Sequence, residues 1–172
     1  MDEQLLFQLY YLQTYMAVLA LFPGSFDPFT AGHEAVLRRV LPLFDRVVVA
    51  VGVNSEKAAS GTNGAFGGMF SPEERVERIR TALADCPTVE VTAYEGMTID
   101  LCHRIGAKAI IRGIRTAKDF EYEQTIAAVN RLQDPSIETL LVMADPDHID
   151  ISSTLERERL SHGAPRPNSP AA

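Results

Sequence analysis

A histidine at the start of a predicted helix is the first residue whose setting suggests chemistry. Residues 17–36 begin with an apolar run that predicts a buried strand, and then pass through Pro23-Gly24 and Asp27-Pro28, which predict a break in regular structure. His33 follows as a helical pattern begins. Backbone N–H groups at a helix N-terminus stabilise an anion, and a histidine there can donate to a phosphate oxygen. The segment therefore predicts a nucleotide phosphate site, with a helix cap and a surface histidine as the alternative.

Two arginines leave a second buried run in the sequence Arg-Gly-Ile-Arg. Arg112 and Arg115 stand at its ends, with Gly113 between them. Guanidinium groups pair with phosphate through two hydrogen bonds, and a glycine lets a ligand approach the backbone closely. The pattern indicates an anion site, and two surface arginines in a loop are the alternative.

Hydroxyl side chains and a lysine lie near the ends of other predicted strands. Ser152, Ser153 and Thr154 open the last predicted helix, where they can cap it and also bind a phosphate. Lys57 follows the second predicted strand and can bind phosphate as a point charge, although one more solvated lysine is the alternative.

Taken together, these segments resemble a known family. Ser-Phe-Asp-Pro-Phe-Thr-Ala-Gly-His at 25–33 resembles the (T/H)xGH signature of the nucleotidyltransferase superfamily, and its surroundings are similar to those of bacterial phosphopantetheine adenylyltransferases. The sequence RGIRTAKDFEYE at 112–123 is similar to the family's RG(L/I)R…DFEYE segment, and 151–157 to its ISS(S/T)xxR signature. The resemblance extends from residue 16 to about residue 160.

The resemblance implies an activity and a set of site residues. The reaction is transfer of the adenylyl group of ATP to 4′-phosphopantetheine, which gives dephospho-coenzyme A and pyrophosphate. His33 is implied to stabilise the transition state. The implied acceptor contacts are Ser25, Lys57, Thr98 and Arg112. The implied ATP contacts are Ser25, Phe26, His33, Gly113, Ile114, Arg115, Glu123, His148, Ile149, Asp150, Ile151, Ser152, Ser153 and Thr154. A homohexamer is also implied, whereas feedback by coenzyme A is left open.

Three acidic residues follow the arginines at alternate positions, Asp119, Glu121 and Glu123. Such carboxylates can act as acids and bases or hold a metal. We interpret them as a helix surface with one ligand contact and expect no dedicated metal cage. Mg²⁺ is therefore expected to arrive with ATP and to stay largely hydrated.

Some features depart from the family pattern. Ser25 stands where threonine is usual, and the Gly-rich stretch 58–68 resembles an insertion. Residues 1–15 are expected to be an extension, either disordered or an upstream start chosen in error, with a short amphipathic helix as the alternative. The Pro-rich tail 162–172 is expected to be disordered. It ends sooner than in relatives, which could alter hexamer packing.

The elements that must position these residues alternate along the chain. The sequence predicts strands from Ala17 and over 46–53, 89–94, 108–111 and 138–143, and helices over 34–44, 71–83, 98–105, 116–132 and 152–160. Pro42 is expected to end or kink the first helix. We therefore predict one α/β domain over 16–161, a Rossmann-like open sheet of about five parallel strands with helices on both faces. Ligands bind beyond the carboxyl ends of such strands, where all the segments above fall.

Composition excludes several classes of protein. A net charge of −7 over 172 residues argues against broad nucleic-acid binding but not against a nucleotide substrate. Cys86 and Cys102 form no disulfide framework or zinc pattern, which indicates reduced thiols. No apolar run approaches the ~20 residues of a membrane span. A cytoplasmic protein without nucleic-acid or membrane partners is expected.

Two other functions stay open. One is a superfamily enzyme that acts on another phosphate or on nicotinamide mononucleotide, although the 112–123 segment weighs against it. The other is a non-catalytic nucleotide sensor that kept the fold. The altered loop and short C-terminus suggest a sensor, whereas His33 and the serine-rich motif oppose it.

Overall fold

One parallel sheet organises the chain. The computed structural model describes residues 2, 4, 6, 7, 17–53, 68–148 and 153–161. Within these, the strands are β1 (Leu19–Gly24), β2 (Arg46–Gly52), β3 (Val89–Tyr94), β4 (Ala109–Ile114) and β5 (Glu138–Met143). They form a five-stranded sheet in the order β3-β2-β1-β4-β5, with every neighbouring pair parallel. The predicted Rossmann-like architecture is therefore confirmed.

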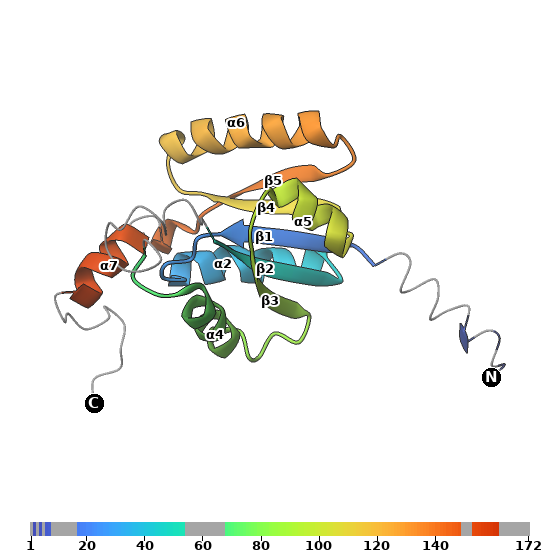
Figure 1. Ribbon diagram of the computed structural model, residues 1–172, viewed down its shortest axis with the longest axis horizontal. Helices are drawn as coiled ribbons and strands as arrows, with labels where there is room; N and C mark the ends of the chain where they lie inside the picture. The colour runs from blue at the N-terminus through green and yellow to red at the C-terminus, as the bar shows by residue number, and fades with distance from the viewer. Residues whose placement is uncertain are drawn as a thin grey trace.

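Helices cover both faces of the sheet, as the alternating pattern predicts (Figure 1). On one face, α2 (Ala31–Val40) and α4 (Pro72–Ala82) pack their apolar stripes against β1 and β2, in a core that includes Leu37 and Val49, both fully buried. On the other face, α5 (Thr98–Ile105) buries Cys102 against the sheet. The long helix α6 (Ala117–Gln133) lies along β4 and β5 (Figure 1).

Strand β1 is fully paired on one side and only partly paired on the other. It pairs with β2 along its whole length, from Leu19 to Gly24, but with β4 only at Ala20 and Leu21. Chain order also reverses here, because β2 and β3 lie to one side of β1 and β4 and β5 to the other. The crevice at such a reversal is where open α/β sheets bind their ligands.

The structure corrects three predicted boundaries near this crevice. Pro23-Gly24 does not break the strand but ends it, and Arg112 and Gly113 lie inside β4 instead of beyond it. The first helix begins at Ala31 and ends at Val40, and Pro42 stands in the 3₁₀ turn η1 (Leu41–Leu43) that follows. A proline cannot donate the hydrogen bond that would continue an α-helix.

The predicted helix cap at Ser71 and the predicted helix end at Gly106 are confirmed. Ser71 caps α4 in a reciprocal box with Glu74, in which each backbone N–H donates to the other side chain. Gly106 ends α5 in the left-handed region with φ 75°. The bounds of β3, β5 and α5 agree with the predicted 89–94, 138–143 and 98–105.

Two short elements complete the carboxyl edge of the sheet. The 3₁₀ turn η2 (Pro146–His148) follows β5, and α7 (Ser153–Ser161) lies near the loop that follows β1 (Figure 1). No helix in the part of the chain that the structure describes is long and apolar enough to cross a membrane. The expectations for most of 1–15, for most of the Gly-rich stretch and for 162–172 lie outside the described residues.

The packing of α4 generates a stability prediction. Ile79 is completely buried between this helix and the sheet. We expect Ile79→Ala to lower the free energy of unfolding by about 2–5 kcal/mol, because it removes buried apolar surface and leaves a cavity. Thr81→Ala, at an exposed position of the same helix, should change it by less than about 0.5 kcal/mol. Equal denaturation midpoints for Ile79→Ala and the wild type would contradict the assigned core.

Candidate active site

A cavity of about 620 Å³ opens at the carboxyl ends of β1 and β4. It takes residues from the loop after β1, from β4, from the first turns of α6, from Ala144 after β5 and from α7. This size and position are usual for a nucleotide-sized ligand in an open α/β sheet. The sequence analysis expects the segments after all five strands to form one site. Those after β1, β4 and β5 line the cavity, whereas Thr98, after β3, does not, and 54–57 lie outside the described residues.

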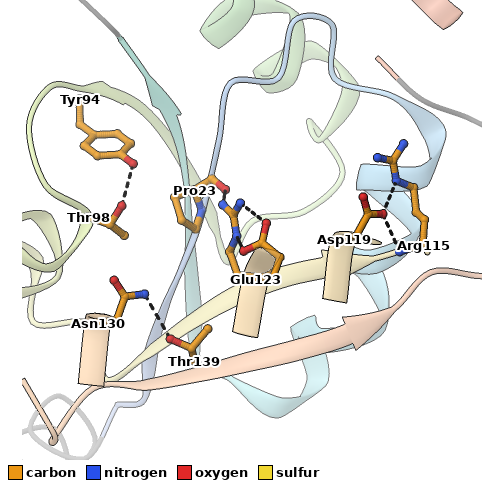
Figure 2. A network of polar contacts seen from close by, with 9 residues as sticks. Pro23, Tyr94, Thr98, Arg115, Asp119, Glu123, Asn130 and Thr139 are labelled. Carbon is orange, nitrogen blue, oxygen red and sulfur yellow. Dashed lines mark hydrogen bonds and ion pairs between the residues drawn. The ribbon is translucent and has the colours of Figure 1, made fainter. Parts of the chain in front are cut away.

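An arginine fills the crevice where β1 and β4 part. Arg112 Nη1 donates to the Pro23 carbonyl at 2.7 Å, while its Nε and Nη2 donate to the two oxygens of Glu123 at 2.7 and 2.5 Å (Figure 2). Glu123 is only 6% exposed. The guanidinium therefore joins β4, β1 and α6 at the floor of the cavity.

His33 is part of the helix cap and part of the cavity wall. Thr30 caps α2: its hydroxyl accepts from the His33 N–H, and the Thr30 N–H donates to His33 Nδ1 at 3.0 Å. Since Nδ1 accepts, the neutral imidazole carries its proton on Nε2. His33 can therefore cap the helix through Nδ1 and still offer Nε2 to a ligand, so the two interpretations of this histidine are compatible.

The charge of His33 is set by its surroundings. Burial, together with the positive charges of Arg115 and Arg112, lowers the pKa of His33 from 6.5 to about 4. The ring is therefore neutral near neutral pH and offers a hydrogen bond from Nε2. A neutral donor can stabilise charge that develops on a phosphate oxygen without a proton being transferred.

Aromatic rings hold the imidazole in place. Phe29 stacks on His33 with ring centroids 5.6 Å apart, and Phe26 meets it edge-on at 5.2 Å. Phe26 is 3% exposed and adopts φ 46°, which is strained for a residue with a side chain. A Cβ at Gly24 would lie 2.8 Å from the Phe26 ring, so only glycine leaves room for it.

A buried carboxylate ties the loop after β1 to its surroundings. Asp27, 4% exposed, accepts from the N–H groups of Met69 and Phe70 at 2.8 and 3.1 Å. Its carbonyl accepts from Arg157 of α7 at 2.8 Å. Arg75 of α4 donates to the Ser25 carbonyl at 2.7 Å. The loop that carries Ser25 and leads into α2 with His33 is thus fixed from both α4 and α7.

The cavity wall is predominantly cationic. Arg112, Arg115, Lys118 and Arg157 line it, together with the carboxylates of Asp119 and Glu123. Each carboxylate forms an ion pair with an arginine, so neither stands alone as a metal ligand. Within 17–53, 68–148 and 153–161, no group of three or more His, Cys, Asp or Glu side chains could hold a metal ion. The arginines and the lysine suit an anionic ligand such as a polyphosphate.

Most of the sequence-predicted site residues within the described ranges line this cavity. These are Ser25, Phe26, His33, Arg112, Gly113, Arg115, Glu123, Ser153 and Thr154. His148 lies beside Gly32, and its buried Nδ1 has no partner among the described residues. Ile114 is only 1% exposed and belongs to the core. The Thr98 hydroxyl lies 3.1 Å from the Tyr94 hydroxyl (Figure 2). Neither residue lines the cavity. Lys57 and 149–152 lie outside the described residues.

Sequence reasoning missed several lining residues. The missed residues on α6 are Lys118, Asp119 and Tyr122, which share one face of the helix with the predicted Glu123 and line the cavity beside it. Their spacing of one helical turn was the available signal. Arg157 lines the wall from α7, although the signature at 151–157 already included it.

Comparisons with known proteins define the family. The cytidylyltransferase-like family model matches residues 21–159. Among curated relatives, phosphopantetheine adenylyltransferase of Leptospira biflexa is 40% identical over 86% of this chain and 87% of its own length. The enzyme of Phocaeicola vulgatus is 46% identical over 84% of this chain and 89% of its own length. The enzyme of Leuconostoc citreum is 45% identical over 85% of this chain and 86% of its own length.

Solved structures agree on the fold at lower identity. A bifunctional NMN adenylyltransferase/ADP ribose pyrophosphatase from Francisella tularensis gives a TM-score of 0.65 at 18% identity, over 88% of this chain and 44% of that one. A candidate nicotinate-nucleotide adenylyltransferase from Vibrio parahaemolyticus gives a TM-score of 0.58 at 19% identity, over 87% of this chain and 90% of that one. The family model and the curated relatives, each over more than four-fifths of the chain, define a nucleotidyltransferase. The chain belongs to the cytidylyltransferase-like family and, within it, to the phosphopantetheine adenylyltransferases.

The lowered pKa of His33 predicts how stability changes with pH. Between pH 6.5 and 4 the unfolded chain takes up a proton on this histidine that the folded chain does not. The free energy of unfolding should therefore fall as pH is lowered through that window, by up to about 3 kcal/mol. Replacing His33 with asparagine should remove this slope, which denaturant titrations at several pH values would measure.

Two carboxyl groups with lowered pKa values titrate below that window. Hydrogen bonds from Arg38 lower the pKa of Asp85 to about 2, and hydrogen bonds from Ser136 and His103 do the same for Asp134. Their contributions to stability are present above pH 3.8 and are lost only as pH falls toward 2. Parallel curves for the wild type and His33→Asn between pH 6.5 and 4 would mean that His33 is not held neutral.

Proposed function

We propose that this protein transfers the adenylyl group of ATP to 4′-phosphopantetheine, with dephospho-coenzyme A and pyrophosphate as products. Membership of the phosphopantetheine adenylyltransferases, over more than four-fifths of the chain, supports this activity. The observation that carries it is the site itself: a neutral His33 donor beside Arg112 and Arg115, in the crevice where β1 and β4 part.

The reaction needs positioning more than acid–base chemistry. A phosphate oxygen of the acceptor attacks the α-phosphorus of ATP, a new P–O bond forms, and the bond to the β-phosphate oxygen breaks as pyrophosphate leaves. The attacking phosphate is already anionic near neutral pH, so no general base is required. Catalysis then consists of alignment and stabilisation of charge on the phosphoryl oxygens. His33 Nε2–H, Arg115 and the N-termini of α2 and α7 supply that stabilisation.

The two substrates occupy different parts of this site in our proposal. Ser25, Lys57, Thr98 and Arg112 hold phosphopantetheine, while Ser25 and the other ATP contacts from the sequence analysis, with the exception of Glu123, hold ATP. Mg²⁺ arrives as the ATP complex, which agrees with lining carboxylates that are already paired with arginines. Hydrated Mg²⁺ would neutralise phosphate charge with few protein ligands.

Assembly and location extend the proposal. Phe120, Tyr122, Val129 and Leu132 of α6 are exposed apolar side chains, and Leu132 is 87% exposed. Such a surface supports association between copies, and we propose the homohexamer that the family resemblance implies. A cytoplasmic location is supported by Cys86 and Cys102, both free thiols.

Turnover decides between the proposed activity and its alternatives. Pyrophosphate release should be measured from ATP with 4′-phosphopantetheine, nicotinamide mononucleotide or glycerol 3-phosphate as the acceptor. We expect release with phosphopantetheine alone. Release with another acceptor only would assign a different superfamily reaction. ATP binding without release in any of the three reactions would indicate a nucleotide sensor.

The role of His33 has a direct kinetic consequence. We expect His33→Ala to lower kcat by about two to three orders of magnitude, the scale of losing one donor to a developing oxyanion. His103→Ala is the matched control, because His103 is exposed on α5, bonded to Asp134, and does not line the cavity. A wild-type rate in His33→Ala, measured by pyrophosphate release, would remove this residue from the chemistry.

A further inference from the structure

Each of the two cavity arginines is held by its own carboxylate on α6. Arg115 Nε donates to Asp119 Oδ2 at 3.2 Å, and Arg112 donates from two nitrogens to Glu123 (Figure 2). Asp119 and Glu123 are four residues apart, so they lie one turn apart on the same face of the helix. One helix face thus holds both arginines of the Arg-Gly-Ile-Arg sequence.

The contacts of Arg112 leave little freedom to its guanidinium. Of its five N–H groups, one on Nε and one on Nη2 bond Glu123, and one on Nη1 bonds the Pro23 carbonyl. Three fixed bonds in one plane determine the direction of the remaining two N–H groups, which belong to Nη1 and Nη2. Because Arg112 lines the cavity, that second edge is available to a phosphate.

Charge and burial argue against Glu123 as a primary ligand contact. Its side chain is 8% exposed, and both of its oxygens already accept from Arg112. A carboxylate beside the phosphates of two anionic substrates repels them unless a cation neutralises it. Both oxygens of Glu123 are committed to Arg112, which places this carboxylate to orient the guanidinium.

Asp119 has the same relation to Arg115. Its Oδ2 accepts from the Arg115 side chain and also from the Arg115 backbone N–H at 3.1 Å. The same oxygen accepts from the Thr116 N–H at 3.2 Å, in the cap that starts α6. The carboxylate thus fixes both the backbone and the side chain of Arg115 at the end of β4.

We infer that Glu123 and Asp119 are positioning residues with separate targets: Glu123 orients Arg112 toward the acceptor phosphate, and Asp119 orients Arg115 toward ATP. The inference rests on the proposed function for the identity of the two substrates. It assigns Glu123 a different role from the nucleotide contact that the family resemblance implies.

Separate binding measurements test this division. Calorimetry with 4′-phosphopantetheine alone and with ATP alone gives a Kd for each, and steady-state assays give both KM values. For Glu123→Gln we expect at least a tenfold loss of phosphopantetheine affinity, roughly one bidentate charge-assisted pair, with ATP affinity changed less than about threefold. For Asp119→Asn we expect the reverse. Glu121→Gln, an exposed position of the same helix outside the cavity wall, is the control and should match the wild type.

A double-mutant cycle separates action through Arg112 from an independent contact. Arg112→Lys keeps the charge and loses the planar fork. If Glu123 acts through Arg112, the double variant should lose no more phosphopantetheine affinity than the worse single variant. Losses that multiply, or a Glu123→Gln variant that weakens ATP alone, would overturn the inference.

Controls keep failure of folding and failure of the proposed function distinguishable. Thermal unfolding of each variant reports on folding. If Glu123→Gln does not fold, Glu123→Asp replaces it, because aspartate keeps the negative charge but is too short to bond both guanidinium nitrogens. A wild-type protein that does not bind phosphopantetheine would refute the proposed function, and the ATP affinity of Asp119→Asn would then decide the inference by itself.

Discussion

Strands β1 and β4 pair at only two residues and then part, and the arrangement of the site depends on how that gap is closed. Arg112 bridges it, with one hydrogen bond to the β1 carbonyl of Pro23 and two to Glu123 of α6. Without a cation at this point, a buried carboxylate and a strand carbonyl would face each other without a donor. The same guanidinium therefore connects β4 to β1 beyond their last ladder pair and forms the floor of the cavity.

The loop after β1 carries Ser25 and Phe26 of the cavity wall and leads into α2, and its shape is imposed by contacts that are distant in sequence. Asp27 accepts hydrogen bonds from residues 42 and 43 positions further along the chain, and Arg157 reaches its carbonyl from 130 positions away. The strained backbone of Phe26 persists because the ring packs against Phe22, Phe29 and His33. Such strain is tolerated where surrounding contacts determine the conformation.

The order of elements and the edge that binds ligand could be read from the sequence, because they depend on local patterns. Alternating apolar runs predicted the parallel sheet, and the stop at Gly106 and the cap at Ser71 fell where expected. Pro23 was misread as a strand break. Its carbonyl, and hence its missing N–H, faces the side on which the ladder to β4 has already ended, so β1 loses no hydrogen bond there.

What the sequence left undetermined is which side chains pair with one another. The acidic residues of 119–123 were interpreted as a helix surface with one ligand contact, which the resemblance assigned to Glu123. Neither pattern indicated the pairing of the buried Glu123 with Arg112. Helix α6 buries Glu123 and Asn130 and leaves Val129 and Leu132 exposed, which inverts the usual amphipathic pattern. No periodicity rule identifies the inward face of such a helix. The shape of the loop after β1, the Arg112–Glu123 pair and the role of Asp27 depend on contacts that no local pattern specifies.

The cap of α2 has a consequence for how this helix can evolve. Its third position, where glutamate commonly completes a capping box, is occupied by His33, whose Nδ1 performs that task. Glutamate would add a favourable charge to the helix dipole, but under the proposed function it would also place an anion beside the bound phosphate. Histidine at this position then gives up some stability of the helix start. If His33 acts as proposed, the stability of α2 and the rate of turnover place opposite demands on the same residue.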